Sequence, residues 1–316
     1  MFPVLIIAYV NYNNVVARIK ELRSLGFESI SIFVDGFTEN ANSLKAGDRK
    51  KLVDYISQEF AALRIKRAFF NESNLGLGVA VPRAIDWFFE GEEYGLILED
   101  DCSLQSYAKP FLNQCEQLIT LNPDAVICLS NPHSNAAEFE HKSNMFFIPS
   151  NFFSSWGWIC HREVWKTISI RKIELAEVLY AARQIQTISS IEKFWLALSW
   201  MDVWLTLRAN QHRLWAFRFT ILLIIFGVRI YYPSVKLVQH LPDACSTNVT
   251  NRPTWDEKQD LKSIPRIPSK PYKVLDVNWL DGYIAKKVQG AECRGLIIRL
   301  VYRLITKLKS NNRITY

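Results

Sequence analysis

The 316-residue sequence predicts an α/β fold with an open, mostly parallel sheet that helices cover on both faces. Strand-like and helix-like segments alternate over about the first 130 residues, and this alternation is typical of such sheets. In addition, 49% of the residues are hydrophobic and 13% are aromatic, which is enough to bury a substantial core.

Each predicted strand of the first half is a short apolar run that ends at a polar residue or a turn. These strands span residues 4–9, 29–34, 65–70, 95–98 and 125–129. The predicted helices follow residue 14, cover 48–63, surround 85–90 and cover 107–121, because their apolar residues recur at helical spacing. Asn13 or Asn14 can cap the first helix, and Gly26 can end it.

The second half is rich in Trp and Phe and poor in glycine. An aromatic run occupies residues 152–158, residues 172–226 favour helices, and 229–233 favour a short strand before a proline-rich, loop-like segment. We therefore divide the chain into an α/β half (residues 1–130), a second half of the same domain (131–285) and a tail (286–316).

The tail carries all of the net charge. Residues 286–316 hold eight basic groups and one acid, whereas the other residues are neutral overall. A nucleic-acid-binding domain usually spreads positive charge over a folded face, so we expect no nucleic-acid partner. Apolar and basic residues fall on opposite faces of a helix over 294–309, which predicts either contact with an anionic membrane surface or docking on the chain's own domain.

The six cysteines show no paired spacing, which indicates reduced, mostly buried thiols in a reducing compartment. The five histidines show no zinc-binding arrangement. Residues 3–9 are too short and lack the basic residues of a secretory leader, and residues 219–228 are too short to span a bilayer. We expect a cytoplasmic protein that lies peripherally on the inner face of the cell membrane.

Three adjacent carboxylates, Glu99, Asp100 and Asp101, follow the predicted strand 95–98. Neighbouring acids repel one another, and each is costly to desolvate without a counter-charge. A divalent cation relieves both costs, and oxygen ligands suit Mn²⁺ or Mg²⁺; a solvated acidic turn is the alternative. Asp35 also follows a strand, so both acidic strand ends should face one nucleotide-sized pocket at the carboxyl edge of the sheet.

Several segments together carry a resemblance to a known family. In chain order they are residues 3–9, Val34-Asp35-Gly36, Asn74-Leu75-Gly76, 84–90, 96–102, Trp156-Gly157-Trp158 with Trp165, and Pro233 before Leu237-Val238. This set resembles the GT-A glycosyltransferases of the nucleotide-diphospho-sugar transferase superfamily, and within them bacterial relatives of N-acetylglucosaminyltransferase I. The run from Asn74 to Cys102 is the most specific part.

The resemblance implies a nucleotide-sugar donor and a saccharide or lipid-linked saccharide acceptor. It implies that Asp101 binds a metal that bridges the donor diphosphate, that Asp35 contacts the base, and that Glu99 and Asp100 hold the sugar and ribose. Tyr9 and Asn74 complete the implied donor-binding set. Trp156 and Trp158 could form a platform for the acceptor or the sugar, with core packing as the alternative.

The sequence also departs from the family. Asn11 stands where bacterial relatives have an Arg, and an ungapped count places Ala216 where the family has its presumed catalytic base. Asp202, between Trp200 and Trp204, is our first candidate for a relocated base, since an acceptor hydroxyl must lose a proton as it attacks. Asp243 or Glu192 is the second, and loss of turnover is the third.

We therefore expect an inverting, metal-dependent glycosyltransferase of cell-envelope polysaccharide synthesis, of the hexosyl- or N-acetylhexosaminyl-transferase class. Residues 1–130 would bind the nucleotide-sugar and 131–285 would face the acceptor. A nucleotidyltransferase is disfavoured, because residues 8–14 contain no glycine, lysine or arginine. A catalytically silent nucleotide-sugar-binding or membrane-surface module is the alternative from another class.

Overall fold

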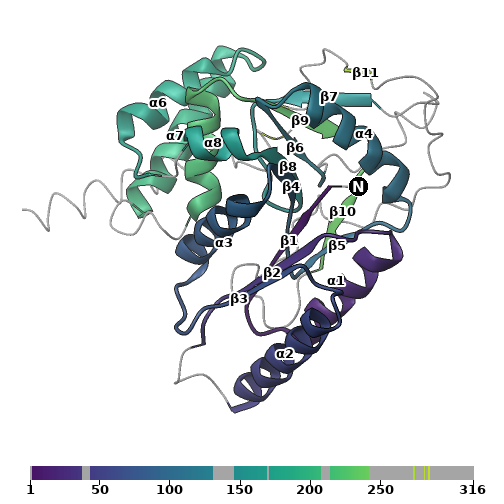
Figure 1. Cartoon of the computed structure of the whole chain (residues 1–316). Coiled ribbons are helices and arrows are strands. Elements are labelled where there is room, and N and C mark those ends of the chain that lie inside the picture. Colours follow the sequence, from purple (N-terminus) through teal and green to yellow (C-terminus); the bar gives the residue numbers. More distant parts are fainter. Residues whose placement is uncertain are drawn as a thin grey trace, which may run out of the picture.

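The structure is a computed structural model that describes residues 2–37, 43–130, 146–168, 171–207, 214–241, 273–274, 281 and 284. It confirms the α/β fold class: a nine-stranded sheet has the order β11-β7-β9-β6-β8-β4-β1-β2-β3, and five of its eight strand pairings are parallel (Figure 1). The strands of this sheet are β1 (Val4–Ala8), β2 (Ile30–Val34), β3 (Arg67–Phe70), β4 (Tyr94–Glu99), β6 (Ala125–Cys128), β7 (Phe146–Ser150), β8 (Trp158–His161), β9 (Arg229–Pro233) and β11 (Lys273–Val274).

Helices cover both faces of the sheet, as predicted. They are α1 (Tyr12–Ser24), α2 (Ser43–Ala61), α3 (Leu77–Gly91), α4 (Ala108–Leu121), α5 (Arg162–Ile168), α6 (Leu175–Gln184), α7 (Ser190–Leu207) and α8 (Trp215–Ile225). Alternate side chains of β1 point to opposite faces of the sheet and pack into two separate hydrophobic cores. Val4 and Ile6 belong to the core with α1, α2 and α4, whereas Leu5 and Ile7 belong to the core with α3, α6, α7 and α8 (Figure 1).

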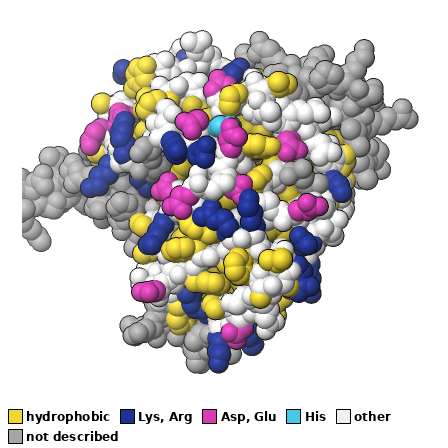
Figure 2. All heavy atoms as spheres, in the orientation of Figure 1, with side chains coloured by type: hydrophobic (Ala, Val, Ile, Leu, Met, Phe, Trp, Pro, Cys, Tyr) yellow, Lys and Arg dark blue, Asp and Glu magenta, His cyan; other side chains and the backbone are white. Residues whose placement is uncertain are grey.

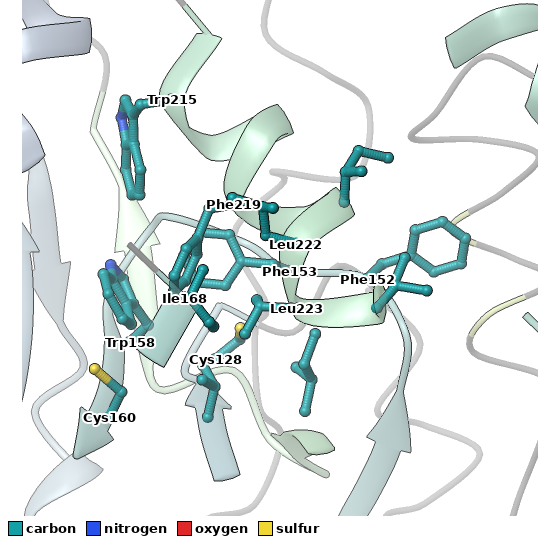
Figure 3. Close-up of a cluster of buried hydrophobic side chains, with 14 of the residues drawn as sticks. Cys128, Phe152, Phe153, Trp158, Cys160, Ile168, Trp215, Phe219, Leu222 and Leu223 are labelled. Carbon is teal, nitrogen blue, oxygen red and sulfur yellow. The ribbon is translucent and has the colours of Figure 1, made fainter. Parts of the chain in front are cut away.

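The second core is dominated by aromatic side chains. Phe153, Trp158 and Phe219 pack edge-on or tilted with ring centroids 4.8–5.3 Å apart, and Trp215 closes the group (Figure 3). Such contacts contribute to stability beyond the area they bury. The aromatic run predicted from the sequence thus fixes the helical layer against the sheet.

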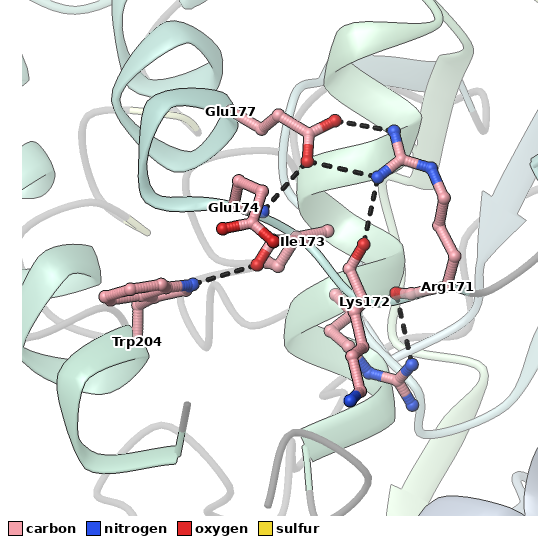
Figure 4. A network of polar contacts seen from close by, with 7 residues as sticks. Arg171, Lys172, Ile173, Glu174, Glu177 and Trp204 are labelled. Carbon is pink, nitrogen blue, oxygen red and sulfur yellow. Dashed lines mark hydrogen bonds and ion pairs between the residues drawn. The ribbon is translucent and has the colours of Figure 1, made fainter. Parts of the chain in front are cut away.

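A polar network outside this core ties the start of α6 to its neighbours. The Arg171 guanidinium donates two hydrogen bonds to the Glu177 carboxylate, and Glu177 also accepts from the backbone N–H of Glu174 (Figure 4). The indole N–H of Trp204, on α7, donates to the Ile173 carbonyl. The predicted helical region 172–226 contains the helices α6, α7 and α8, and the Trp204–Ile173 contact links α7 to the segment before α6.

The structure adds a small second sheet that the sequence did not predict. It consists of β5 (Cys102–Leu104) and β10 (Val238–His240), which pair antiparallel with His240 opposite Cys102. The first helix is capped by Asn11, whose side chain accepts from the Asn14 N–H, so the prediction of Asn13 or Asn14 as the cap was wrong. This cap gives Asn11 a local structural role.

Several predictions concern parts of the chain that the structure does not describe, among them the amphipathic tail 286–316 and Asp243. None of the helices in the described ranges combines the length and apolar character that crossing a bilayer requires. Cys102, Cys115, Cys128 and Cys160 are buried free thiols, as expected. Figure 2 shows basic and acidic side chains interspersed on the face it views.

Candidate functional site

The acidic residues predicted to share a pocket lie at one edge of the main sheet. In the register of the parallel strands, Ile7 of β1 lies opposite Glu99 of β4 and opposite Phe33 of β2. The backbone N–H of Asp100 donates to the Ile7 carbonyl and that of Asp35 to the Ala8 carbonyl, at 3.0 and 2.8 Å. Asp35 and Asp100 therefore flank the carboxyl end of β1. Because β1 lies between β2 and β4, two strand spacings, roughly 10 Å, separate the backbones of these two acids.

Asp101 is oriented by His240, which lies 139 positions later in the chain. The His240 Nε2 lies 3.0 Å from the Asp101 Oδ2, and the indole ring of Trp156 stacks on the imidazole with centroids 4.5 Å apart and planes 10° apart. We call Asp101, His240 and Trp156 the acid corner. The His240 side chain is only 3% exposed and that of Asp101 22%, so the carboxylate faces outward from a buried support.

The β5–β10 sheet explains how the acid corner is held. The Leu241 N–H donates to the Asp101 carbonyl at 2.7 Å, directly after the β10 strand that carries His240. On the other side, Glu21 of α1 accepts hydrogen bonds from the Ser103 hydroxyl and the Leu104 N–H at 2.7 and 2.6 Å. Asp101 therefore sits on a turn fixed at both sides.

The surroundings of Glu99 disfavour its charged form. Burial, and then the charges of Asp101 and Asp100, raise the pKa of Glu99 to about 8, while His240 acts in the opposite direction. The folded protein therefore retains a proton on Glu99 at neutral pH. Burial is the larger cause and repulsion by the neighbouring acids the smaller, and the sequence predicted both.

The Glu99 pKa makes the stability of the metal-free protein depend on pH. Because the folded-state pKa lies above the usual value of 4.5, this stabilisation is present in full below about pH 4.5 and is lost as the pH rises through about 8. We expect the melting temperature measured in chelator to fall between pH 5 and pH 8.5, and to fall less in Glu99→Gln. The exposed variant Glu28→Gln serves as the control and should follow the wild type.

Asp35 is fixed as part of a second cluster, at the ends of β2 and β3. Its Oδ1 accepts hydrogen bonds from the Gly36 N–H, the Asn71 amide and the Leu75 N–H at 2.8, 3.0 and 3.2 Å. Within the described residues, every hydrogen bond to this carboxylate falls on Oδ1. We call Asp35, Asn71 and the segment 74–76 the base pocket, a name that refers only to the role predicted for Asp35.

Two sequence motifs meet in the base pocket. A Cβ atom added to Gly36 would lie 1.9 Å from the Ser73 carbonyl carbon, because Phe37 and Ser73 form a β-bridge. Asn74 supports the next turn, since its Oδ1 accepts from the Gly76 N–H at 2.6 Å. The structure therefore brings Asp35-Gly36 and Asn74-Leu75-Gly76 together.

Arg49 of α2 also reaches this cluster, and sequence reasoning missed it. Its guanidinium donates to the carbonyl oxygens of Asp35 and Asn71. Burial lowers the pKa of Arg49, while the neighbouring Asp35 and Tyr9 raise it. These opposing effects place Tyr9, another predicted donor-binding residue, within electrostatic reach of the same guanidinium.

The two tryptophans predicted as a platform have different environments. Trp156 is half-buried and stacks on His240, beside Asp101. Trp158 is completely buried among Phe153, Trp165 and Phe219, so its ring offers no face to a sugar and the platform role is corrected to core packing. Gly157 between them has φ +71°, and this left-handed turn sends the two rings in different directions.

Of the candidate bases, Asp243 lies outside the described residues, and the structure does not bring Asp202 or Glu192 into the acid corner. Asp202 lies on α7, which Figure 1 shows with α6 and α8 and apart from β5 and β10. Glu192 forms a reciprocal cap with Ser189 at the start of α7, at 2.8 and 3.3 Å, which accounts for it locally. Ala216 packs against the aromatic core on α8. The base role of Asp202 stays a prediction.

The carboxylates at the acid corner are oxygen ligands of the kind that hard cations prefer. In the described residues, no group of three or more His, Cys, Asp or Glu side chains is arranged to hold a metal ion. Mg²⁺ and related hard cations are often held by one or two carboxylates together with substrate phosphates. Asp101, with Asp100 and Glu99 beside it, can supply that minimal set.

Comparisons with known proteins add little. No family model matches this chain, and no curated protein matches it. Among solved structures, this chain is similar to residues 1–349 of S. aureus TarS, with 14% sequence identity and a TM-score of 0.37, over 71% of this chain and 70% of that one. It is also similar to the mannosyltransferase PcManGT from Pyrobaculum calidifontis in complex with GDP-Man and Mn²⁺, with 10% identity and a TM-score of 0.38, over 71% of this chain and 70% of that one. A third similar structure is a UDP-glucose pyrophosphorylase complexed with UDP-glucose, with 12% identity and a TM-score of 0.31, over 54% of this chain and 80% of that one. Likenesses this weak carry no argument, so the functional case rests on the residues themselves.

Proposed function

We propose that this protein is a glycosyltransferase that moves a sugar, of the hexose or N-acetylhexosamine class, from a nucleoside diphosphate to a saccharide or lipid-linked saccharide acceptor. The observation that carries the proposal is the juxtaposition of the acid corner and the base pocket on the two sides of β1. A donor with its diphosphate at Asp101 and its nucleoside at Asp35 would lie across the carboxyl end of β1.

The chemistry assigned to the two sites is complementary. Mn²⁺ or Mg²⁺ held at Asp101 would neutralise the charge that develops on the leaving diphosphate. The contact from His240 orients the Asp101 carboxylate. The resemblance assigns Glu99 and Asp100 to hydroxyl groups of the sugar and ribose. Trp156 offers a half-buried aromatic surface at the same corner. We propose an inverting displacement, with Asp202 as the candidate base.

A donor panel tests this function. Thermal-shift measurements with nucleotide-sugars of each common base, with and without Mn²⁺, should identify at least one that raises the melting temperature only with the metal, because a ligand that binds only the folded state stabilises it. That donor should then release its nucleoside diphosphate. Binding without release across the panel would favour the silent module, for which Ala216 at the family's base position is the supporting observation.

The cellular setting is a separate proposal. We propose a cytoplasmic, peripheral protein that acts in cell-envelope polysaccharide synthesis and contacts an anionic membrane through residues 294–309, which lie outside the described residues. Removing the chain after residue 292 should move the protein from the membrane fraction to the soluble fraction. The double variant Lys50→Gln, Lys51→Gln removes two charges elsewhere and should leave the distribution unchanged. An unchanged distribution after truncation would refute the anchor.

A further inference from the structure

Arg49 joins the two strand ends that form the base pocket. From α2 its guanidinium reaches the carbonyl oxygens of Asp35, directly after β2, and of Asn71, directly after β3; the second of these bonds is 2.9 Å long. Asp35 and Asn71 are each 5% exposed. One side chain therefore sets the spacing of two buried backbone groups that frame the pocket.

The chemistry of this contact requires an arginine. A guanidinium donates several N–H groups in one plane and can hold two carbonyl oxygens at a fixed separation, whereas an ammonium is a compact point charge on a flexible stem. Asn71 in turn donates its side-chain amide to the Asp35 Oδ1. Arg49 thus acts on the Asp35 carboxylate through the backbone on both sides of it.

The surroundings of Arg49 include two predicted donor-binding residues. Burial lowers the pKa of Arg49, while the charges of Asp35 and Tyr9 raise it. The resemblance assigns Asp35 to the base and Tyr9 to the donor as a whole. The acid corner, by contrast, is supported by Glu21 and His240, on the other side of β1.

The geometry points to Arg49 as a positioning residue for the nucleoside part of the donor, and this inference rests on the proposed function. Arg49 keeps the strand ends in place so that Asp35, with Oδ1 occupied by three N–H donors, presents Oδ2 to the nucleoside. Diphosphate and metal binding at Asp101 is independent of Arg49. The two halves of the donor are therefore separable by mutation.

The test compares two probes by titration calorimetry in Mn²⁺. One is inorganic pyrophosphate, and the other is the nucleoside diphosphate that the wild type binds most tightly among the uridine, guanosine, cytidine, adenosine and thymidine forms. In Arg49→Gln we expect the preference for the nucleoside diphosphate over pyrophosphate to fall about tenfold, with pyrophosphate affinity unchanged. Arg49→Lys should fall between, and the exposed neighbour Lys50→Gln should match the wild type.

The outcomes separate the alternatives. Two results would overturn the inference while leaving the proposed function intact. Equal weakening of both probes would mean that Arg49 only supports the fold. Unchanged affinity for both probes would mean that Arg49 has no role at the nucleoside. A wild-type protein that binds none of the five diphosphates would overturn both. If Arg49→Gln does not fold, Arg49→Lys decides the same comparison.

Discussion

Asp101→Ala is expected to reduce the metal-dependent release of nucleoside diphosphate by at least about a hundredfold. Asp101 is the carboxylate that the β5–β10 sheet and His240 hold in a fixed orientation at the sheet edge. On the proposed function, Asp101 would be the oriented protein ligand of the cation, and the cation would supply the positive charge that stabilises the leaving diphosphate. The measurement is the initial rate of release across a Mn²⁺ titration, with the donor identified by the panel.

The matched control for this variant is Asp124→Ala. Asp124 is exposed and pairs with Arg229 at 2.6 Å, an ion pair worth little to stability, so its removal should leave the release rate unchanged. A folded Asp101→Ala protein that retains wild-type release would remove the acid corner from the mechanism. Circular dichroism of both variants separates a loss of chemistry from a loss of fold.

Gly36→Ala is expected to lower the free energy of unfolding by about 3 kcal/mol and to abolish donor binding. The added Cβ would lie 1.9 and 2.0 Å from the carbonyl carbon and oxygen of Ser73. These are backbone atoms, and the Phe37–Ser73 bridge and the Leu75 bond to Asp35 hold them in place. Urea unfolding measures the first effect, and the thermal shift with donor measures the second.

A second glycine supplies the control for this change. Gly47 lies in α2, and a Cβ atom built there meets nothing within 4 Å. Gly47→Ala should therefore stabilise the protein by about 0.5–1 kcal/mol, since alanine loses less conformational freedom in a helix. Equal destabilisation by the two substitutions would contradict the close contact between the strand ends.

The sequence could predict the parts of the fold that depend on local periodicity. The apolar runs 4–9 and 95–98 read as buried strands because β1 is buried throughout and β4 nearly so. The acids that follow them had to lie at the carboxyl edge once the strands were parallel. The meeting of Asp35-Gly36 with Asn74-Leu75-Gly76 follows from the same logic, because β2 and β3 are neighbours.

The remaining features depend on pairing between distant residues. The strands β5 and β10 have three residues each, too few for a periodic signal, and they join positions about 140 residues apart. The role of His240 is therefore invisible in the sequence. Likewise, no sequence pattern predicts that Arg49 of α2 will contact the backbone at the ends of β2 and β3. Trp156 and Trp158 look alike in composition, and only the turn at Gly157 decides that one ring is buried and the other meets His240.

The span of the Asp101–His240 contact has a consequence for biosynthesis. During translation the N-terminal strands and their acids emerge from the ribosome long before His240 does, because 139 positions separate the two partners. A nascent chain shorter than this carries the carboxylates without the imidazole that orients them. The Asp101–His240 contact can therefore form only after at least 139 further residues have been translated.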